Sequence, residues 1–297
     1  MKTTSQTDFR QEVTNEVIKM IEAGTAPWIR PWSVGEIPAA FNPTTNNPYR
    51  GGNIIALMVA SLRKGYTDPR WCTYRQAVAT SWQVRKGEKS SRIEVFKDEL
   101  IEDEETGDKK RRVVARHYPV FNAQQIDGIP KIVLPKKEKW EAIQAGERIM
   151  RTSGADIRYG GTSAYYSPFH DYIQLPNKED FFNASWFYST ASHELGHWTG
   201  HPSRLNRLSL TAANGNKNTE EYAREELVAE LASLFLSMKT GLPHNPERHA
   251  AYISSWLRAL KKDKNELFRA ASAASKATDY LLQVKKKKTN SALTAAA

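Results

Sequence analysis

One segment, His193-Glu-Leu-Gly-His197, constrains the fold of this chain more than any other part of its sequence. Residues four apart on an α-helix share one face, so His193 and His197 can direct both imidazoles at the same point. Glu194 follows the first histidine and can take a proton from a water held there. The spacing therefore predicts a helix that carries a metal centre, with two histidine ligands and Glu194 as the general base. The alternative is an ordinary amphipathic helix with surface histidines.

The residues on either side of this motif favour a helix that ends soon after it. Asn183-Ala-Ser185 can begin the helix, and we expect Ser185 to be its N-cap. Apolar residues in between are spaced to bury one side. Gly200 and Pro202 then end the helix, as glycine followed by proline commonly does.

A zinc site needs a third protein ligand, which must come from outside the motif. In one family of zinc peptidases a third histidine follows the second at a fixed distance, but this chain has Ser203 at that position. His201 lies four residues after His197, although Gly200 and Pro202 oppose a helix that would continue that far. His201 therefore stays an alternative ligand.

A second helix, expected over residues 221–240, offers acidic ligands. Glu226 and Glu230 share a face with apolar residues, where a charge is costly unless it is paired or bound to a cation. We predict Glu226 as the third ligand, and Glu230 as the partner that orients a ligand histidine or as an alternative ligand. A similar pattern of acids occurs in the gluzincins, zinc peptidases of the thermolysin type. Glu225 is expected on the solvated flank of this helix.

Composition limits the compartment and the partners. The 297 residues are 40% hydrophobic, which suffices for one or two domains with real cores. Cys72 is the single cysteine, so no intramolecular disulfide is possible, and the N-terminus is polar rather than an apolar leader. No apolar stretch is long enough to span a membrane. We therefore expect a cytoplasmic protein without a membrane partner.

Positive charge and aromatic residues gather in the first third of the chain. The net charge of +10 favours nucleic acid as a partner, and residues 28–92 hold ten Lys and Arg against three acids. Unpaired bases stack on aromatic faces while basic side chains bind the phosphate backbone, so we predict binding of single-stranded DNA. The alternative is that the individual tryptophans are core residues. The candidate contacts are Trp28, Arg30, Trp32, Tyr49, Arg50, Arg70, Trp71, Tyr74, Arg75, Trp82, Arg85 and Lys86.

The apolar pattern predicts an α+β protein in two parts, joined by a proline-rich connection near residue 130. Residues 1–130 form an N-terminal α/β part, residues 131–284 hold a small sheet and the motif helix, and residues 285–297 are a basic, disordered tail. The acidic stretch 98–108 is expected at the tip of a hairpin. Further helices are expected over about 8–23, 53–64, 137–152 and 245–260 and in a last segment that ends near 284, with strands over 92–96, 113–121, 155–159, 163–166 and 171–175.

With these motifs the chain resembles the ArdC family of antirestriction proteins from conjugative plasmids, over nearly its whole length. In the N-terminal half the resemblance rests on Pro27-Trp-Ile-Arg-Pro-Trp32, Tyr49-Arg-Gly-Gly-Asn53, Gly65-Tyr-Thr-Asp-Pro-Arg-Trp71 and Trp82-Gln-Val-Arg-Lys-Gly-Glu88. In the C-terminal half it rests on His193-Glu-Leu-Gly-His-Trp-Thr-Gly-His201, Arg204-Leu-Asn-Arg207 and Glu225-Glu-Leu-Val-Ala-Glu230.

The resemblance implies a domain that binds single-stranded DNA without sequence preference, followed by a zincin-like metallopeptidase domain similar to those of DNA–protein crosslink proteases. It implies a role in protecting incoming plasmid DNA from host restriction during conjugation. We expect Zn²⁺ as the ion, with Mn²⁺ as the alternative, and DNA-bound proteins as peptidase substrates. The competing hypothesis is a purely DNA-binding protein whose metal site is structural or vestigial. A zinc deaminase is disfavoured because its signature requires two cysteines.

Overall fold

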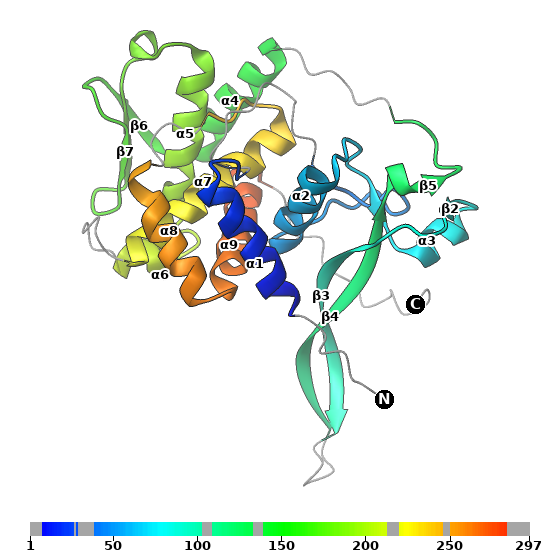
Figure 1. Cartoon of the computed structure of the whole chain (residues 1–297). Helices are drawn as coiled ribbons and strands as arrows, with labels where there is room; N and C mark the ends of the chain where they lie inside the picture. The colour runs from blue at the N-terminus through cyan, green and yellow to red at the C-terminus, as the bar shows by residue number, and fades with distance from the viewer. Residues whose placement is uncertain are drawn as a thin grey trace.

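Helices from the two ends of the chain pack together, and small sheets flank them (Figure 1). The structure is a computed structural model that describes residues 8–26, 28, 39–102, 109–132, 139–212, 220–245 and 250–283. Its α-helices are α1 (Phe9–Glu22), α2 (Gly52–Lys64), α3 (Tyr74–Ala79), α4 (Lys139–Ser153), α5 (Ala184–Trp198), α6 (Leu208–Ala212), α7 (Glu220–Thr240), α8 (Ala250–Lys262) and α9 (Asn265–Leu281). Its strands are β1 (Trp71–Cys72), β2 (Gln83–Val84), β3 (Ser91–Glu102), β4 (Lys109–Asn122), β5 (Ile126–Asp127), β6 (Asp156–Tyr159), β7 (Tyr165–Ser167) and β8 (Tyr172–Leu175). This mixture of helices and sheets confirms the expected α+β class.

Helices α1 and α2 begin and end where the sequence provides caps. Asp8 is the N-cap of α1, and its side chain accepts a hydrogen bond from the N–H of Gln11 at 3.1 Å. Helix α2 lies between Gly51 and Gly65, whose φ angles of 56° and 71° belong to the region that favours glycine. Both helices are found where the apolar pattern predicts them.

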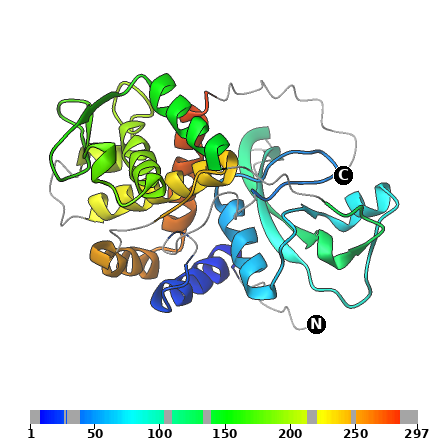
Figure 2. The ribbon, with the colours of Figure 1, turned by 90° about the horizontal axis from the view of Figure 1, so that it is seen from above.

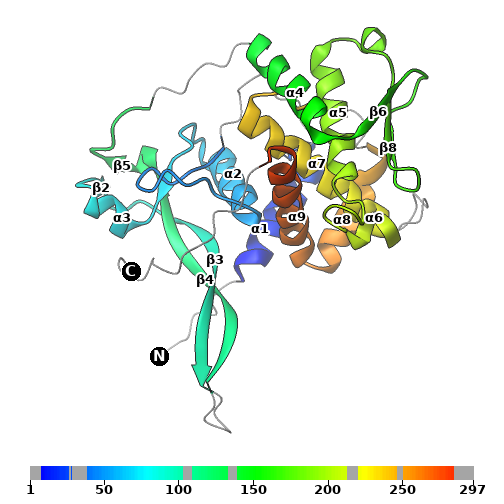
Figure 3. The same ribbon diagram turned by 180° about the vertical axis from the view of Figure 1, so that it is seen from behind.

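A long β-hairpin projects from the body of the molecule (Figures 1 and 3). Strands β3 and β4 pair antiparallel from Ser91 opposite Val120 to Glu102 opposite Lys109, and β1 pairs with the other side of β4. The hairpin is therefore confirmed and is longer than predicted. Its expected acidic tip falls partly on residues 103–108, which lie outside the described residues. Strands β2 and β5 form a separate two-stranded sheet.

A three-stranded sheet precedes the motif helix, as expected. Its order is β6-β8-β7, with β8 parallel to β6 and antiparallel to β7. Ile173 and Leu175 on the central strand β8 are fully buried in a cluster that includes Phe187 and Leu195 of α5. Strand β7 lies at one edge of this sheet and contacts the motif helix α5.

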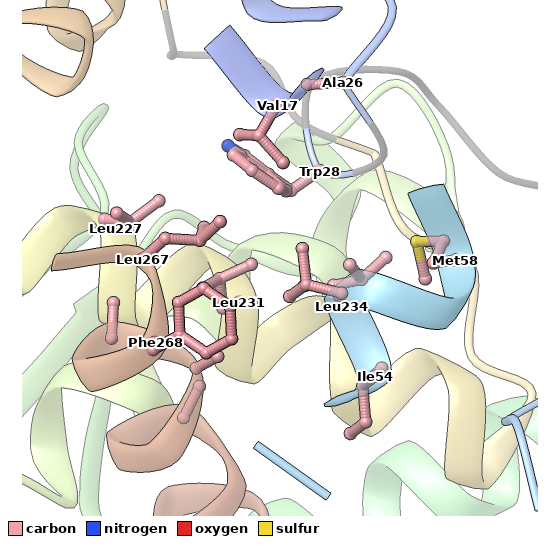
Figure 4. Packing of buried hydrophobic residues seen from close by; sticks show 14 of the residues in the cluster. Val17, Ala26, Trp28, Ile54, Met58, Leu227, Leu231, Leu234, Leu267 and Phe268 are labelled. Atoms are coloured by element: carbon pink, nitrogen blue, oxygen red, sulfur yellow. The ribbon is translucent and has the colours of Figure 1, made fainter. Parts of the chain in front are cut away.

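The largest hydrophobic core joins helices from both halves of the chain (Figure 4). Val17 of α1 and Ile54 of α2 belong to the same cluster as Leu231 and Leu234 of α7 and Phe268 of α9. Seen from above, α1 and α2 lie between the sheets of the N-terminal half and the helices of the C-terminal half (Figure 2). One core thus spans both sides of the boundary expected near residue 130, and that boundary stays a prediction.

Helix α9 is the last helix of the part of the chain that the structure describes. It ends at Leu281, close to the expected end, and the tail 285–297 lies outside the described residues. Within the part of the chain that the structure describes, no helix is both long enough and apolar enough to cross a bilayer.

Candidate metal centre

Helix α5 carries the motif in its last turns and ends directly after it. Asn183 is the N-cap, and its side chain accepts a hydrogen bond from the N–H of Trp186 at 3.2 Å. The expectation that Ser185 would be the cap is wrong, because the helix already begins at Ala184. After the helix ends, the N–H of Gly200 donates to the carbonyl of His197 at 2.8 Å.

Gly196, inside the motif, lets α7 approach α5 closely. A Cβ atom at this position would lie 3.1 Å from Cα and 3.3 Å from the carbonyl oxygen of Ala229 on α7. A side chain there would push the two backbones apart, because interiors are closely packed. The helix that carries the acidic residues therefore packs directly on the motif helix.

His193, His197 and Glu226 bring their ligand atoms together between α5 and α7, all within 4.8 Å of one another. The Nε2 atoms of the two histidines lie 3.0 Å apart, and Glu226 oxygens lie 3.4 Å from Nε2 of His193 and 3.5 Å from Nε2 of His197. In a tetrahedral zinc site with bonds of about 2.1 Å, neighbouring ligand atoms are about 3.4 Å apart. The residues present therefore fit a divalent cation held by two nitrogens and a carboxylate.

The Nδ1 atoms of both histidines face other carboxylates of α7. Glu230 Oε1 lies 2.5 Å from Nδ1 of His193, and Glu225 Oε1 lies 3.3 Å from Nδ1 of His197. Glu225 is only 1% exposed, so the expectation that it lies on a solvated flank is wrong. The reason is that α7 is enclosed on all sides, since every residue from Glu225 to Met238 is buried.

Arg207 compensates the buried charge of Glu225. Its guanidinium donates to both carboxylate oxygens, with Nε 3.0 Å from Oε2 and Nη2 2.5 Å from Oε1. It also donates to Oγ1 of Thr199 and to the carbonyl of Gly196, each at 2.7 Å. Gly200 leaves room for it, because a Cβ atom there would lie 2.6 Å from Nη2. The ion pair thus fastens the chain that follows α5 onto α7.

In the metal-free chain the carboxylates favour charged imidazoles. Burial lowers the pKa of His193, but Glu230 and Glu226 outweigh burial and raise that pKa well above its ordinary value. Burial also lowers the pKa of His197, but Glu226 and Glu225 outweigh it and raise that pKa to about 9. The two imidazoles in turn hold the pKa of Glu226 below its ordinary value despite burial. Metal binding at neutral pH therefore has to displace protons from this site.

Glu194 lies beside the two imidazoles and is 7% exposed. Burial raises the pKa of its carboxyl group, against the opposite effect of His193 and His197. The backbone of Tyr166, on the edge strand β7, acts on the same carboxylate and lowers its pKa. A buried carboxylate with a raised pKa fits a group that accepts a proton and passes it on.

Two tyrosines next to Glu226 were missed by the sequence reasoning. The hydroxyl of Tyr222 donates to Glu226, and burial together with that carboxylate raises the pKa of Tyr222. The hydroxyl of Tyr252, on α8, lies 3.4 Å from that of Tyr222. Tyr222 stands four residues before Glu226 on one helix face, a spacing that could have found it. Tyr252 comes from a separate helix and gives no such signal.

His201 lies apart from the convergent ligand atoms. Its Nδ1 is 2.8 Å from Oγ of Ser203 and 3.9 Å from Asp171 Oδ2. The chain turns back after α5, where the N–H of Leu205 donates to the carbonyl of Thr199. Among the described residues, the group with convergent ligand atoms contains Glu226 and neither His201 nor Glu230.

Several expected DNA contacts are buried. Trp28 and Trp71 are 0% and 1% exposed, so a base cannot stack on either ring and that expectation is wrong. Both rings fill hydrophobic clusters instead. Arg70 is also buried and pairs with Asp68 at 2.7 Å. Tyr49 is half-buried and donates its hydroxyl to the carbonyl of Trp71 at 2.9 Å.

The remaining predicted DNA contacts differ in their exposure to solvent. Tyr74 and Arg75 on α3 and Lys86 after β2 are exposed. Arg30 and Trp32 lie outside the described residues. The others are half-buried or paired with acids: Trp82 packs on the cluster of Cys72 and Ile126, Arg50 pairs with Asp279, and Arg85 pairs with Glu88 and Asp127. The exposed candidates therefore lie on α3, in the loop after β2 and at Arg50.

Two protein-family models match this chain. Residues 7–121 match the N-terminal domain of the antirestriction factor ArdC, and residues 144–273 match a zincin-like metallopeptidase. The convergent ligand atoms of His193, His197 and Glu226 all lie within the second match. A zincin-like domain implies a metal, in agreement with the fit of these residues.

Solved structures and curated relatives are similar to this chain over most of its length. The ArdC antirestriction protein from the R388 plasmid is 39% identical, with 93% of this chain and 97% of that chain covered, and its metal-free and Mn(II)-bound structures give TM-scores of 0.78 and 0.76. An uncharacterized protein of Sinorhizobium fredii is 36% identical over 93% of this chain and 92% of its own length. Two Escherichia coli proteins named DNA primase TraC are 44% and 41% identical over 94% of this chain. This chain spans only 27% and 20% of their lengths.

Proposed function

The chain belongs to the ArdC family of antirestriction proteins, and on that premise we propose that it binds single-stranded DNA and carries a metal-dependent peptidase centre for proteins held on that DNA. Its role is to protect incoming plasmid DNA from host restriction during conjugation. The observation that carries the peptidase part is the convergence of His193, His197 and Glu226 beside the buried carboxylate of Glu194.

His193, His197 and Glu226 are the proposed metal ligands, and Zn²⁺ is the proposed ion. Two imidazole nitrogens and one carboxylate, with an open fourth position, are typical of catalytic zinc sites. A similar protein has been solved with Mn(II) bound, which supports Mn²⁺ as the alternative. When bound, such an ion supplies the Lewis acidity that polarises a peptide carbonyl and activates water.

Glu194 is the proposed general base. Its raised pKa brings its proton affinity closer to neutral pH, so it can take a proton from the attacking water and give it to the leaving amine. The backbone of Tyr166, on strand β7, acts on this carboxylate and partly offsets the rise of its pKa. Because β7 is an edge strand, an extended peptide can add to it and pass in front of Glu194.

The proposed DNA surface centres on α3. Tyr74 and Val78 lie four residues apart on this helix and are each 48% exposed, so they form an open apolar surface on which a base can stack. Arg75 and Lys86 are exposed cations nearby in the sequence that can bind phosphates without reading the bases. This supports binding of single strands with little sequence preference.

The test of the peptidase uses the variant Glu194→Ala. A purified restriction endonuclease is incubated with the protein, single-stranded DNA and added Zn²⁺ or Mn²⁺, and fragments are followed by mass spectrometry. We expect fragments with the parent and a loss of about 10²- to 10⁴-fold in rate with Glu194→Ala, since general-base catalysis contributes about that much. DNA binding of the variant should equal that of the parent.

Two outcomes would count against this proposal. Equal cleavage by parent and variant removes Glu194 from the chemistry. If no fragments form with either ion and Glu194→Ala still protects DNA from restriction as well as the parent does, the DNA-binding protein with a structural metal site is the better description.

A further inference from the structure

We propose that Glu225, held by Arg207, is a positioning residue that fixes the imidazole of His197 so that its Nε2 atom faces the metal. This inference rests on the proposed metal centre and adds a role for an ion pair that the centre does not itself require. The sequence places Glu225 next to a ligand, but it is the tertiary structure that turns its carboxylate to the rear of His197.

The first step of the argument is the tautomer of His197. A neutral imidazole binds a metal through one nitrogen only when the proton sits on the other, and an acceptor at that other nitrogen selects this form. Nδ1 of His197 lies 3.3 Å from Glu225 Oε1, while its Nε2 lies on the side of His193 and Glu226. Glu225 therefore accepts from Nδ1–H and leaves Nε2 open to the ion.

The second step is that Glu225 cannot turn away from this position. Its carboxylate receives two donors from Arg207 and one from the hydroxyl of Ser209, which lies 2.6 Å from Oε2. With 1% exposure it has no water to turn toward.

The third step is the placement of three carboxylates along α7. Glu230 stands behind His193 as Glu225 stands behind His197, and Glu226 lies between them facing the two Nε2 atoms. One helix thus supplies both rear carboxylates and the third ligand. Arg207 reaches this helix from the chain after α5 and bonds the carbonyl of Gly196 at the same time, so it fixes Glu225 relative to the last turn of the motif helix.

The experiment measures Zn²⁺ affinity by isothermal titration calorimetry for the full chain and its variants. Glu225→Ala removes the acceptor, and we expect affinity to fall about 10- to 100-fold, the usual effect of losing a carboxylate behind a ligand histidine. Glu225→Gln keeps a carbonyl oxygen near Nδ1 and should recover part of that loss. The absorption spectrum of the Co²⁺-loaded protein, which reports ligand geometry, should change in Glu225→Ala more than in Glu225→Gln.

Glu266→Gln is the matched control. Glu266 is also a buried glutamate, 8% exposed, and its ion pairs are with Arg269 at 2.6 Å and Arg224 at 3.3 Å. Its loss should lower thermal stability without changing Zn²⁺ affinity or the Co²⁺ spectrum. Should Glu225→Ala fail to fold, the double variants Arg207→Met/Glu225→Leu and Arg207→Met/Glu225→Gln carry the same comparison, because both remove the buried charges together.

The outcomes separate this inference from the metal centre itself. If the parent binds Zn²⁺, His197→Ala does not, and Glu225→Ala binds as tightly as the parent, the pair is only a structural ion pair and the positioning role is overturned. If Glu225→Ala and Glu225→Gln lose affinity equally, the acceptor is not what matters and the inference also fails. If the parent binds neither Zn²⁺ nor Mn²⁺, the proposed centre falls and this inference falls with it.

Discussion

The imidazole of His197 is held between carboxylates of α7, and this determines how the metal-free protein responds to pH. The pKa of His197 in the folded chain is about 9, above its ordinary value of 6.5. A histidine whose pKa is higher in the folded chain than in the unfolded chain stabilises the fold fully at pH values below its ordinary pKa. This stabilisation is lost as the pH rises through the pKa of the folded chain. We therefore predict that the Tm of the metal-free protein falls between about pH 6.5 and about pH 9.

Scanning calorimetry in EDTA checks this prediction, with saturating Zn²⁺ as the comparison. The bound ion requires neutral imidazoles, so the loaded protein should not show the same decline. His197→Ala should make the decline smaller, leaving the part that comes from the raised pKa of His193, whereas His201→Ala, which changes a histidine outside the cluster, should keep the full decline. A metal-free Tm that stays level or rises across this range would contradict the raised pKa.

At the level of helices, the close contact between α5 and α7 explains why the motif has a glycine at position 196. Gly196 and Ala229 allow the two helices to touch, and this closeness places Glu226 opposite His193 and His197. Gly200 has a similar role one turn later, because the space of its missing side chain is taken by Arg207. Small residues in this region therefore set the distance at which a cation can be shared.

Helix α3 is the element that a DNA-binding test should address first. Tyr74→Ala should weaken binding of an oligo(dT) strand by about 5- to 150-fold, since stacking of one base contributes about 1–3 kcal/mol. Tyr159→Ala is the matched control, because Tyr159 is also 48% exposed but belongs to the sheet next to the metal helix. Fluorescence anisotropy at several salt concentrations measures both. Equal affinities for parent and Tyr74→Ala would move the surface away from α3.

At the scale of the whole molecule, the shared core makes the two functions depend on one folding unit. Leu234 of α7 is fully buried among residues of α1 and α2, so its truncation removes contacts that join both halves (Figure 4). Leu234→Ala should lower the free energy of unfolding by about 2–5 kcal/mol. Loss of DNA binding and release of metal should then occur at the same, lower urea concentration.

Leu100→Ala provides the reference for this experiment, because Leu100 lies on the projecting hairpin and is 67% exposed. Its change in stability should stay within about 0.5 kcal/mol. Two separate transitions in the parent, one for DNA binding and one for metal release, would show instead that the halves unfold independently and that the core joining them contributes little.

Much of the fold could be predicted from local pattern. The helices, the hairpin and the small sheet follow from apolar periodicity and caps, which act between neighbours in the chain. The prediction of Ser185 as the N-cap is wrong because Asn183 and Ser185 are both good N-cap residues. Only the position of the first helical turn decides between them. The prediction that Trp28 and Trp71 contact DNA is wrong because a basic, aromatic stretch has the same composition whether its rings face solvent or a core.

His193, His197 and Glu194 can be assigned from the local pattern alone, because one turn of a helix fixes their relation without help from the rest of the chain. Which carboxylates meet these side chains, and from which side, depends on contacts between distant segments. Glu225, Glu226 and Glu230 lie close together on one helix, and their different positions, with Glu225 and Glu230 behind the imidazoles and Glu226 in front, follow from how α7 packs on α5. Long-range packing leaves no periodic signal in the chain, and for that reason Arg207 and Tyr252 became visible only in three dimensions.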